Sequence, residues 1–167
     1  TAQIAVQAAL TGHLVFTTVH ANNVFDVIGR FRHMGVEPYT FASALNGIVA
    51  QRLVRQVCTE CAVRHKPTLD LLSASGLSRE DLAGWRLRVG RGCGRCRGTG
   101  YRGRRAIAEV MVLNDELREL IVRGEPVRLL REAATRAGTR FLRQVALDSV
   151  RRGETTLAEI NRVTFVG

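Results

Sequence analysis

The spacing of apolar residues predicts alternating helical and extended segments in the first part of the chain. Across residues 2–10, small and apolar side chains recur at helical spacing, and Gly12 follows where a helix C-cap would stand. The run Leu14–Val19 is apolar and β-branched without alternation, as in a strand buried on both faces of a parallel sheet. Helical spacing returns at Val24 and continues to Gly35. We therefore expect a helix, a buried strand and a second helix, in that order.

The middle of the chain is predicted to contain a long helix followed by a polar insert. Apolar residues at helical spacing after Pro38 predict a helix that continues to Cys58. Within the insert we expect a short helix near residues 69–72 and another that Ser78 caps, because Asp81 stands three residues after this serine. Two strands are expected beyond these helices, over the alternating residues 85–89 and the apolar residues 106–112.

The last third of the chain carries start and stop signals for four helices. A capping side chain or a proline stands at three of the expected starts, and glycine follows three of the expected ends. The signals are Asn114 to Gly124, Pro126 to Gly138, Phe141 to Gly153, and a capping box of Thr156 with Glu159. We therefore expect a helical bundle at the C-terminal end.

Composition is that of a soluble globular protein. The chain has 167 residues, of which 46% are hydrophobic and 24% charged. No apolar run approaches the roughly 20 residues that span a bilayer, and the first ten residues lack the basic start of a signal peptide. The sequence starts at Thr1, within what reads as a helix. We expect a soluble fragment of a longer protein.

The net charge of +10 raises the question of nucleic-acid binding. Lys66 is the only lysine among 25 basic residues, and acidic residues are interspersed over most of the chain. The stretch Trp85–Arg105 is different, because it holds eight arginines and no acid. It is either a partner-facing basic surface or a phosphate-binding one. Only Trp85 and Tyr101 could stack on bases there, so we expect no nucleic-acid binding, although a nucleic-acid-binding zinc module remains the alternative.

Four cysteines form two C-x-x-C pairs with 31 residues between them, Cys58 with Cys61 and Cys93 with Cys96. Such a turn places two thiolates on one side of a tight loop, and two turns can complete a tetrahedron around zinc. Four thiolates leave no position open for water, so this Zn²⁺ would be structural rather than catalytic. Disulfides and a redox-active pair are the alternatives. The lack of a secretion signal argues against the first, and the lack of a clear βαβ context argues against the second.

Several segments together resemble the C-terminal portion of the type II secretion and type IV pilus assembly ATPases. They are TAQIAVQAALTGHLVFTTVHANN, MGVEP, AQRLVRQVCTEC, CGRCRGTGYRGRRAIAEV and TTLAEINRVT, and they span nearly the whole chain. The resemblance implies a RecA-like ATPase that works as a homohexameric ring at the cytoplasmic face of the inner membrane. Such a ring hydrolyses ATP with Mg²⁺ and acts on inner-membrane platform and linker proteins to move a pseudopilus or pilus.

The resemblance also implies roles for individual residues. His20 matches the histidine box of the family, which implies that it senses the γ-phosphate of ATP or passes its loss to the next subunit. Taken alone, this residue would be interpreted as a histidine hydrogen-bonded in a turn, and the family match reverses that interpretation. Arg30, Arg102 and Arg104 match recurrent family positions and are the expected nucleotide-binding residues.

Gln51 and Arg52 also match family positions, although a solvated helix face or a helix cap would explain these two residues and Arg30 as well. The sequence departs from the family at two sites. Asn23 stands where the family usually has Asp, and Ala106 stands where it usually has Gly.

The expected fold is α/β, with three parts. Residues 1–57 would be the C-terminal part of a RecA-like P-loop NTPase domain, 58–105 a tetracysteine zinc subdomain, and 106–167 a mainly helical domain. The Walker A loop needs a lysine after glycine, whereas the one lysine here follows His65. The resemblance places Walker A and Walker B before Thr1. We therefore expect the intact protein to hydrolyse ATP and this chain alone to be inactive.

Overall fold

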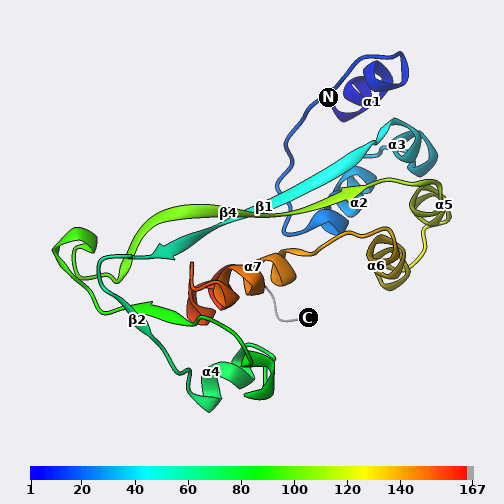
Figure 1. Cartoon of the computed structure of the whole chain (residues 1–167). Coiled ribbons are helices and arrows are strands. Elements are labelled where there is room, and N and C mark those ends of the chain that lie inside the picture. Colours follow the sequence, from blue (N-terminus) through cyan, green and yellow to red (C-terminus); the bar gives the residue numbers. More distant parts are fainter. Residues whose placement is uncertain (165–167) are drawn as a thin grey trace. The chain divides into compact units, whose positions relative to one another are not determined.

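The computed structural model describes residues 1–164, which divide into two compact units. The first unit contains residues 1–50 and 109–140, and the second contains residues 51–108 and those from Phe141 onward. Figure 1 shows the course of the chain from helix α1 in blue to the last helices in red. Among the residues described, no helix is long and apolar enough to cross a membrane.

The first unit is built mainly of helices. They are α1 (Ala2–Leu10), α2 (Val24–His33), α3 (Pro38–Ala44), α5 (Asp115–Arg123) and α6 (Val127–Arg136). Helix α3 lies against α1 and α5, and α5 lies against α6. At the centre, the rings of Phe31 and Phe41 stack with their centroids 4.7 Å apart. Fully buried side chains of Val24, Met111 and Leu117 complete this core, so the unit is held together by apolar burial.

The second unit combines a small sheet with helices. Strands β2 (Ala62–Arg64) and β3 (Arg88–Gly90) pair antiparallel, with Val63 opposite Val89. The helical elements are α4 (Leu69–Ala74), the 3₁₀ turns η1 (Glu80–Leu82) and η2 (Gly94–Cys96), α7 (Leu142–Arg151) and α8 (Leu157–Val163). Helix α8 packs against both α7 and α4. The polar insert between the cysteine pairs is therefore attached to the last helix of this unit.

The predicted long helix from Pro38 to Cys58 is wrong. Helix α3 ends at Ala44, and Gly47–Val57 is strand β1, which pairs with β4 (Tyr101–Val112) as Figure 1 shows. The residues Asn46 and Gly47 interrupt the helix, and the following residues alternate between the two faces of a strand. The apolar spacing in this segment fits both a helix and a strand, and pairing with β4 favours the strand.

The predicted strand over Leu14–Val19 is also wrong. This segment is extended but lies in no sheet, and the side chains of Leu14 and Phe16 are 77% and 87% exposed. A strand buried on both faces needs hydrogen-bonding neighbours on each side. Among residues 1–164 the two sheets consist of β1 with β4 and of β2 with β3, so this run has no such neighbour.

The other element predictions hold with shifted ends. The strand expected over 85–89 lies over Arg88–Gly90, because the N–H of Arg86 donates to the carbonyl of Arg151 instead of to a strand. The strand expected over 106–112 begins earlier, at Tyr101. Ser78 does bind Asp81, but it starts only the 3₁₀ turn η1.

The helices at both ends of the chain begin and end close to the predicted residues. Asn114 caps α5 by accepting from the N–H of Leu117, and Gly124 ends that helix in the left-handed conformation with φ 70°. Helices α5 and α6 belong to the first unit, whereas α7 and α8 belong to the second. That all four form one bundle, and that the domains divide at residues 57 and 105, stay predictions.

Candidate metal centre

The four cysteines gather into one cluster. Their sulfurs all lie within 4.8 Å of one another, with 3.9 Å between Cys58 and Cys93, 3.9 Å between Cys61 and Cys96, and 3.7 Å between Cys93 and Cys96. A tetrahedral metal with bonds of about 2.3 Å to sulfur separates its ligands by about 3.8 Å. All four are free thiols. The cluster therefore has the size that one tetrahedrally coordinated ion requires.

Backbone hydrogen bonds hold the two cysteine loops together. The N–H of Cys58 donates to the carbonyl of Gly100 at 2.9 Å, and the N–H of Arg91 donates to the carbonyl of Cys61 at 3.1 Å. The sulfur of Cys96 accepts from the N–H groups of Cys93 at 3.2 Å and Gly100 at 3.3 Å. Bonds of this kind stabilise a thiolate, so the second loop is shaped for an ionised ligand.

The acidities of the thiols explain why a cation is needed. Burial raises the pKa of the Cys96 thiol, but the N–H donors of Cys93 and Gly100 outweigh it and lower that pKa to about 6. Burial raises the pKa of the Cys61 thiol to about 11. Burial thus opposes ionisation of Cys61, whereas backbone N–H donors favour ionisation of Cys96. A divalent cation stabilises the ionised thiols, and metal binding releases protons.

Glycines bring the two sides of the second cysteine loop into direct contact. A side chain at Gly90 would clash with the backbone of Gly100, and a side chain at Gly92 would lie 2.7 Å from the carbonyl oxygen of Gly98. Gly90 and Gly92 precede Cys93, and the residues that they approach, Gly98 and Gly100, follow Cys96. The chain therefore folds back on itself between these glycines, which only residues without a side chain permit.

The alanine substitution at Gly90 is expected to destabilise the second unit by about 3 kcal/mol and to weaken metal binding, because backbone atoms must move apart. Gly94→Ala is the matched control, since nothing lies within 4 Å of a methyl group there. Thermal unfolding and competition with a chromogenic chelator measure the two effects. Equal stability and affinity in both variants would contradict the close contact.

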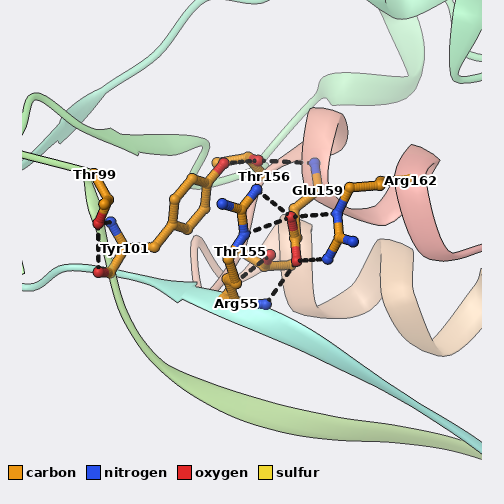
Figure 2. Close-up of polar contacts among 7 residues, drawn as sticks. All are labelled: Arg55, Thr99, Tyr101, Thr155, Thr156, Glu159 and Arg162. Atoms are coloured by element: carbon orange, nitrogen blue, oxygen red, sulfur yellow. Dashed lines mark hydrogen bonds and ion pairs between the residues drawn. The ribbon is translucent and has the colours of Figure 1, made fainter.

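A polar cluster surrounds Tyr101, the first residue of β4 after the second cysteine loop (Figure 2). The carboxylate of Glu159, whose side chain is fully buried, accepts from the guanidinium groups of Arg55 and Arg162 and from the N–H of Arg55. The guanidinium of Arg55 stacks on the ring of Tyr101 at 4.3 Å, and the hydroxyl of Tyr101 lies 2.7 Å from that of Thr156. This cluster joins β1, β4 and helix α8.

The cluster also changes the expected cap of α8. The hydroxyl of Thr156 accepts from the N–H of Glu159 at 3.1 Å, as the capping box predicts. The carboxylate of Glu159 binds the two arginines instead of turning back to the helix start. Burial raises its pKa, but the hydrogen bonds from Arg162 and Arg55 prevail and lower the pKa to about 2.

The residues expected to act on nucleotide lie on exposed surfaces. His20 is exposed in the segment before α2, and Arg30 is exposed in the last turn of α2, beside a hollow of about 540 Å³ in the first unit. Arg102 and Arg104 are exposed on β4 in the second unit, and Arg104 lines a hollow of about 510 Å³ with Arg55 and Tyr101. Their roles toward nucleotide stay predictions.

Gln51 and Arg52 lie on β1 rather than on the expected helix. These two residues therefore lie neither on a helix face nor at a helix cap.

Sequence reasoning missed Glu159 as an ion-pair partner and Glu109 as a buried acid. Glu109 is 3% exposed on β4. A signal existed for it, because the expected strand over 106–112 places this acid in an apolar row between Ile107 and Met111. Glu159 lies 104 positions from Arg55 in the sequence, so no local pattern could show this ion pair.

The chain matches known proteins over nearly its whole length. Residues 1–162 fit the family described as type II/IV secretion system protein. The type IV pilus assembly ATPase PilB of Thermus thermophilus is 48% identical over 160 residues, which cover 96% of this chain and 18% of that protein. The type II secretion system protein HxcR of Pseudomonas aeruginosa is 45% identical over 98% of this chain and 31% of its own length.

The type II secretion system ATPase E of Vibrio cholerae is 42% identical over 165 residues, or 98% of this chain and 32% of that protein. The chain thus spans from 18% to 32% of the length of these relatives.

Proposed function

The chain belongs to the type II/IV secretion system protein family, and on this premise we propose that it is the C-terminal portion of a motor ATPase for type II secretion or type IV pilus assembly. The intact protein hydrolyses ATP with Mg²⁺ as a homohexamer at the cytoplasmic face of the inner membrane. It passes the resulting movement to inner-membrane platform and linker proteins. Relatives that are named as ATPases, with identities of 42% to 48%, support this proposal.

The observation that carries the proposal is the tetracysteine cluster within a chain that matches the family over residues 1–162. We propose that the ion is structural Zn²⁺ held by Cys58, Cys61, Cys93 and Cys96, since four thiolates suit this metal and leave no position for water. The zinc subdomain then comprises residues 58–105. The zinc stiffens the lobe that holds it, and the remaining parts are a RecA-like part over 1–57 and a mainly helical part over 106–167.

The nucleotide roles of this proposal rest on exposed polar residues. His20 acts on the γ-phosphate or reports its loss, and Arg30, Arg102 and Arg104 contact nucleotide. Guanidinium groups suit phosphate oxygens because they bind them through two parallel hydrogen bonds. The chain alone is inactive, because phosphoryl transfer depends on a phosphate-binding loop and Mg²⁺, and its sequence contains no Walker A motif.

The substitution His20→Ala in the full-length protein is expected to lower kcat for ATP hydrolysis at least about tenfold. The substitution removes an imidazole that, in this proposal, stabilises the transition state more than the bound substrate. His33→Ala is the matched control, since His33 is also an exposed histidine of the first unit. Steady-state phosphate release measures both variants. Equal kcat in the two variants would refute the role of His20.

The nucleic-acid alternative makes an opposite prediction. Filter binding of duplex and single-stranded oligonucleotides over a salt series is expected to show no specific retention. Tight binding that weakens steeply with salt would instead favour a nucleic-acid-binding zinc module.

A further inference from the structure

Glu109 is a buried carboxylate to which the proposed reaction assigns no role. On β4 it stands between two apolar residues of the same buried row, and its exposed fraction of 3% is close to the 2% of Ile107 and the 0% of Met111. A carboxylate in such a row costs free energy unless it is hydrogen-bonded. Its partners therefore indicate what it does.

The carboxylate of Glu109 binds the start of helix α2. Its Oε1 accepts from the N–H of Val24 at 2.8 Å, across 85 residues of sequence. The first N–H groups of a helix have no partner within the helix, and its N-terminus favours negative charge. Glu109 thus meets both needs at one point.

Helix α2 also has a local cap. The side-chain oxygen of Asn23 accepts from the N–H groups of Phe25 and Asp26, each at 2.9 Å. Asp26 in turn accepts from the N–H of Asn22 at 3.2 Å. These bonds stay within residues 22–26. The bond that Glu109 accepts adds an attachment of this turn to strand β4.

The turn that is attached in this way carries His20. This histidine is four positions before Val24, so the two Cα atoms lie within about 14 Å of each other. His20 itself is exposed in a segment without regular structure. The position of its imidazole therefore depends on how firmly the turn before α2 is held.

We propose that Glu109 is a positioning residue for ATP hydrolysis, which holds the turn from His20 to Asn23 against β4. This inference rests on the proposed function, because positioning matters for the rate only if His20 acts in hydrolysis. The attachment itself does not depend on that function.

The test compares three variants of the full-length protein. Glu109→Ala removes the acceptor, Glu109→Gln keeps an oxygen of the same shape, and Met111→Val shortens an apolar side chain of the same buried row while leaving the Glu109 carboxylate in place. Amide hydrogen exchange of peptides over residues 20–26 reports the attachment, and kcat and KM for ATP report its consequence.

Glu109→Ala is expected to speed exchange over residues 20–26 and to lower kcat, each about tenfold, with KM within about twofold. Glu109→Gln is expected to restore most of both, and Met111→Val to leave both near the values of the unchanged protein. If Glu109→Ala does not fold, Glu109→Asp takes its place, because it withdraws the carboxylate by one methylene group.

The outcomes separate this inference from the proposed function. Unchanged exchange over 20–26 in Glu109→Ala would overturn the attachment, whatever the rate. Faster exchange with unchanged kcat would overturn the positioning role if His20→Ala is inactive. If His20→Ala is fully active, the proposed role of His20 fails, and a tenfold fall in kcat from Glu109→Ala would then refute positioning through His20.

Discussion

Replacing Cys58 with serine is expected to abolish stoichiometric metal binding and to destabilise the second unit by about 5 kcal/mol. Cys58 is fully buried, and its sulfur lies 3.9 Å from that of Cys93, so the loss opens the cluster from within. A serine hydroxyl is a poor ligand for a soft metal site, and the three remaining thiolates leave the tetrahedral coordination of the ion incomplete. The metal content of the purified chain and its chemical unfolding measure the two effects.

Thr59→Ala provides the control for this experiment, because Thr59 is an exposed neighbour in the same loop. It is expected to keep one metal ion per chain and to change stability by less than about 0.5 kcal/mol. A Cys58→Ser variant that retains one ion per chain would contradict the four-thiolate site. Lowering the pH is expected to release the metal from the unchanged chain, because protons compete for the thiolates.

The second large effect is expected from Glu159→Gln, which should destabilise the second unit by about 3 kcal/mol. The carboxylate is fully buried, whereas the side chains of Arg55 and Arg162 are 45% and 60% exposed. Water can therefore solvate the guanidinium groups after the change. The loss of stability is then at the lower end of the roughly 3–5 kcal/mol that breaking a buried ion pair costs. Glu119→Gln is the control, because Glu119 pairs with Arg123 on the surface and should contribute little.

The pH dependence of stability tests the same cluster with a definite sign. Burial opposes ionisation of Glu159, but Arg162 and Arg55 lower its pKa from 4.5 to about 2 in the folded chain. A lowered pKa stabilises the fold fully above pH 4.5, and this contribution disappears as the pH falls toward 2. The difference in unfolding free energy between Glu159→Gln and the unchanged chain should shrink over that range. A difference that stays constant would show that the carboxylate is not held by these arginines.

The sequence predicted those features that depend on residues near one another in the chain. The cysteine pairs, the helix starts at Asn114 and Thr156, and the glycine ends are local signals, and the structure has them at or beside the predicted residues. The helix after Pro38 failed because helical and strand spacing overlap in a short apolar segment, and pairing with β4 decided between them.

Contacts between distant residues lay beyond the sequence pattern. The strand expected over Leu14–Val19 depends on neighbours that a single segment cannot supply. The attachment of Val24 to Glu109 and the ion pair of Arg55 with Glu159 join residues 85 and 104 positions apart. Only an acid at an apolar position hinted at the first of these, and nothing local marked the second.

The extended run at Leu14 and Phe16 has a practical consequence for work with this chain. Its backbone lies in no sheet and its large apolar side chains face solvent. An apolar, β-branched stretch of this kind is a template on which strands of other molecules can assemble. We therefore expect this stretch to promote association of the chain at high concentration, so dilute samples suit the comparison of the cysteine and glycine variants.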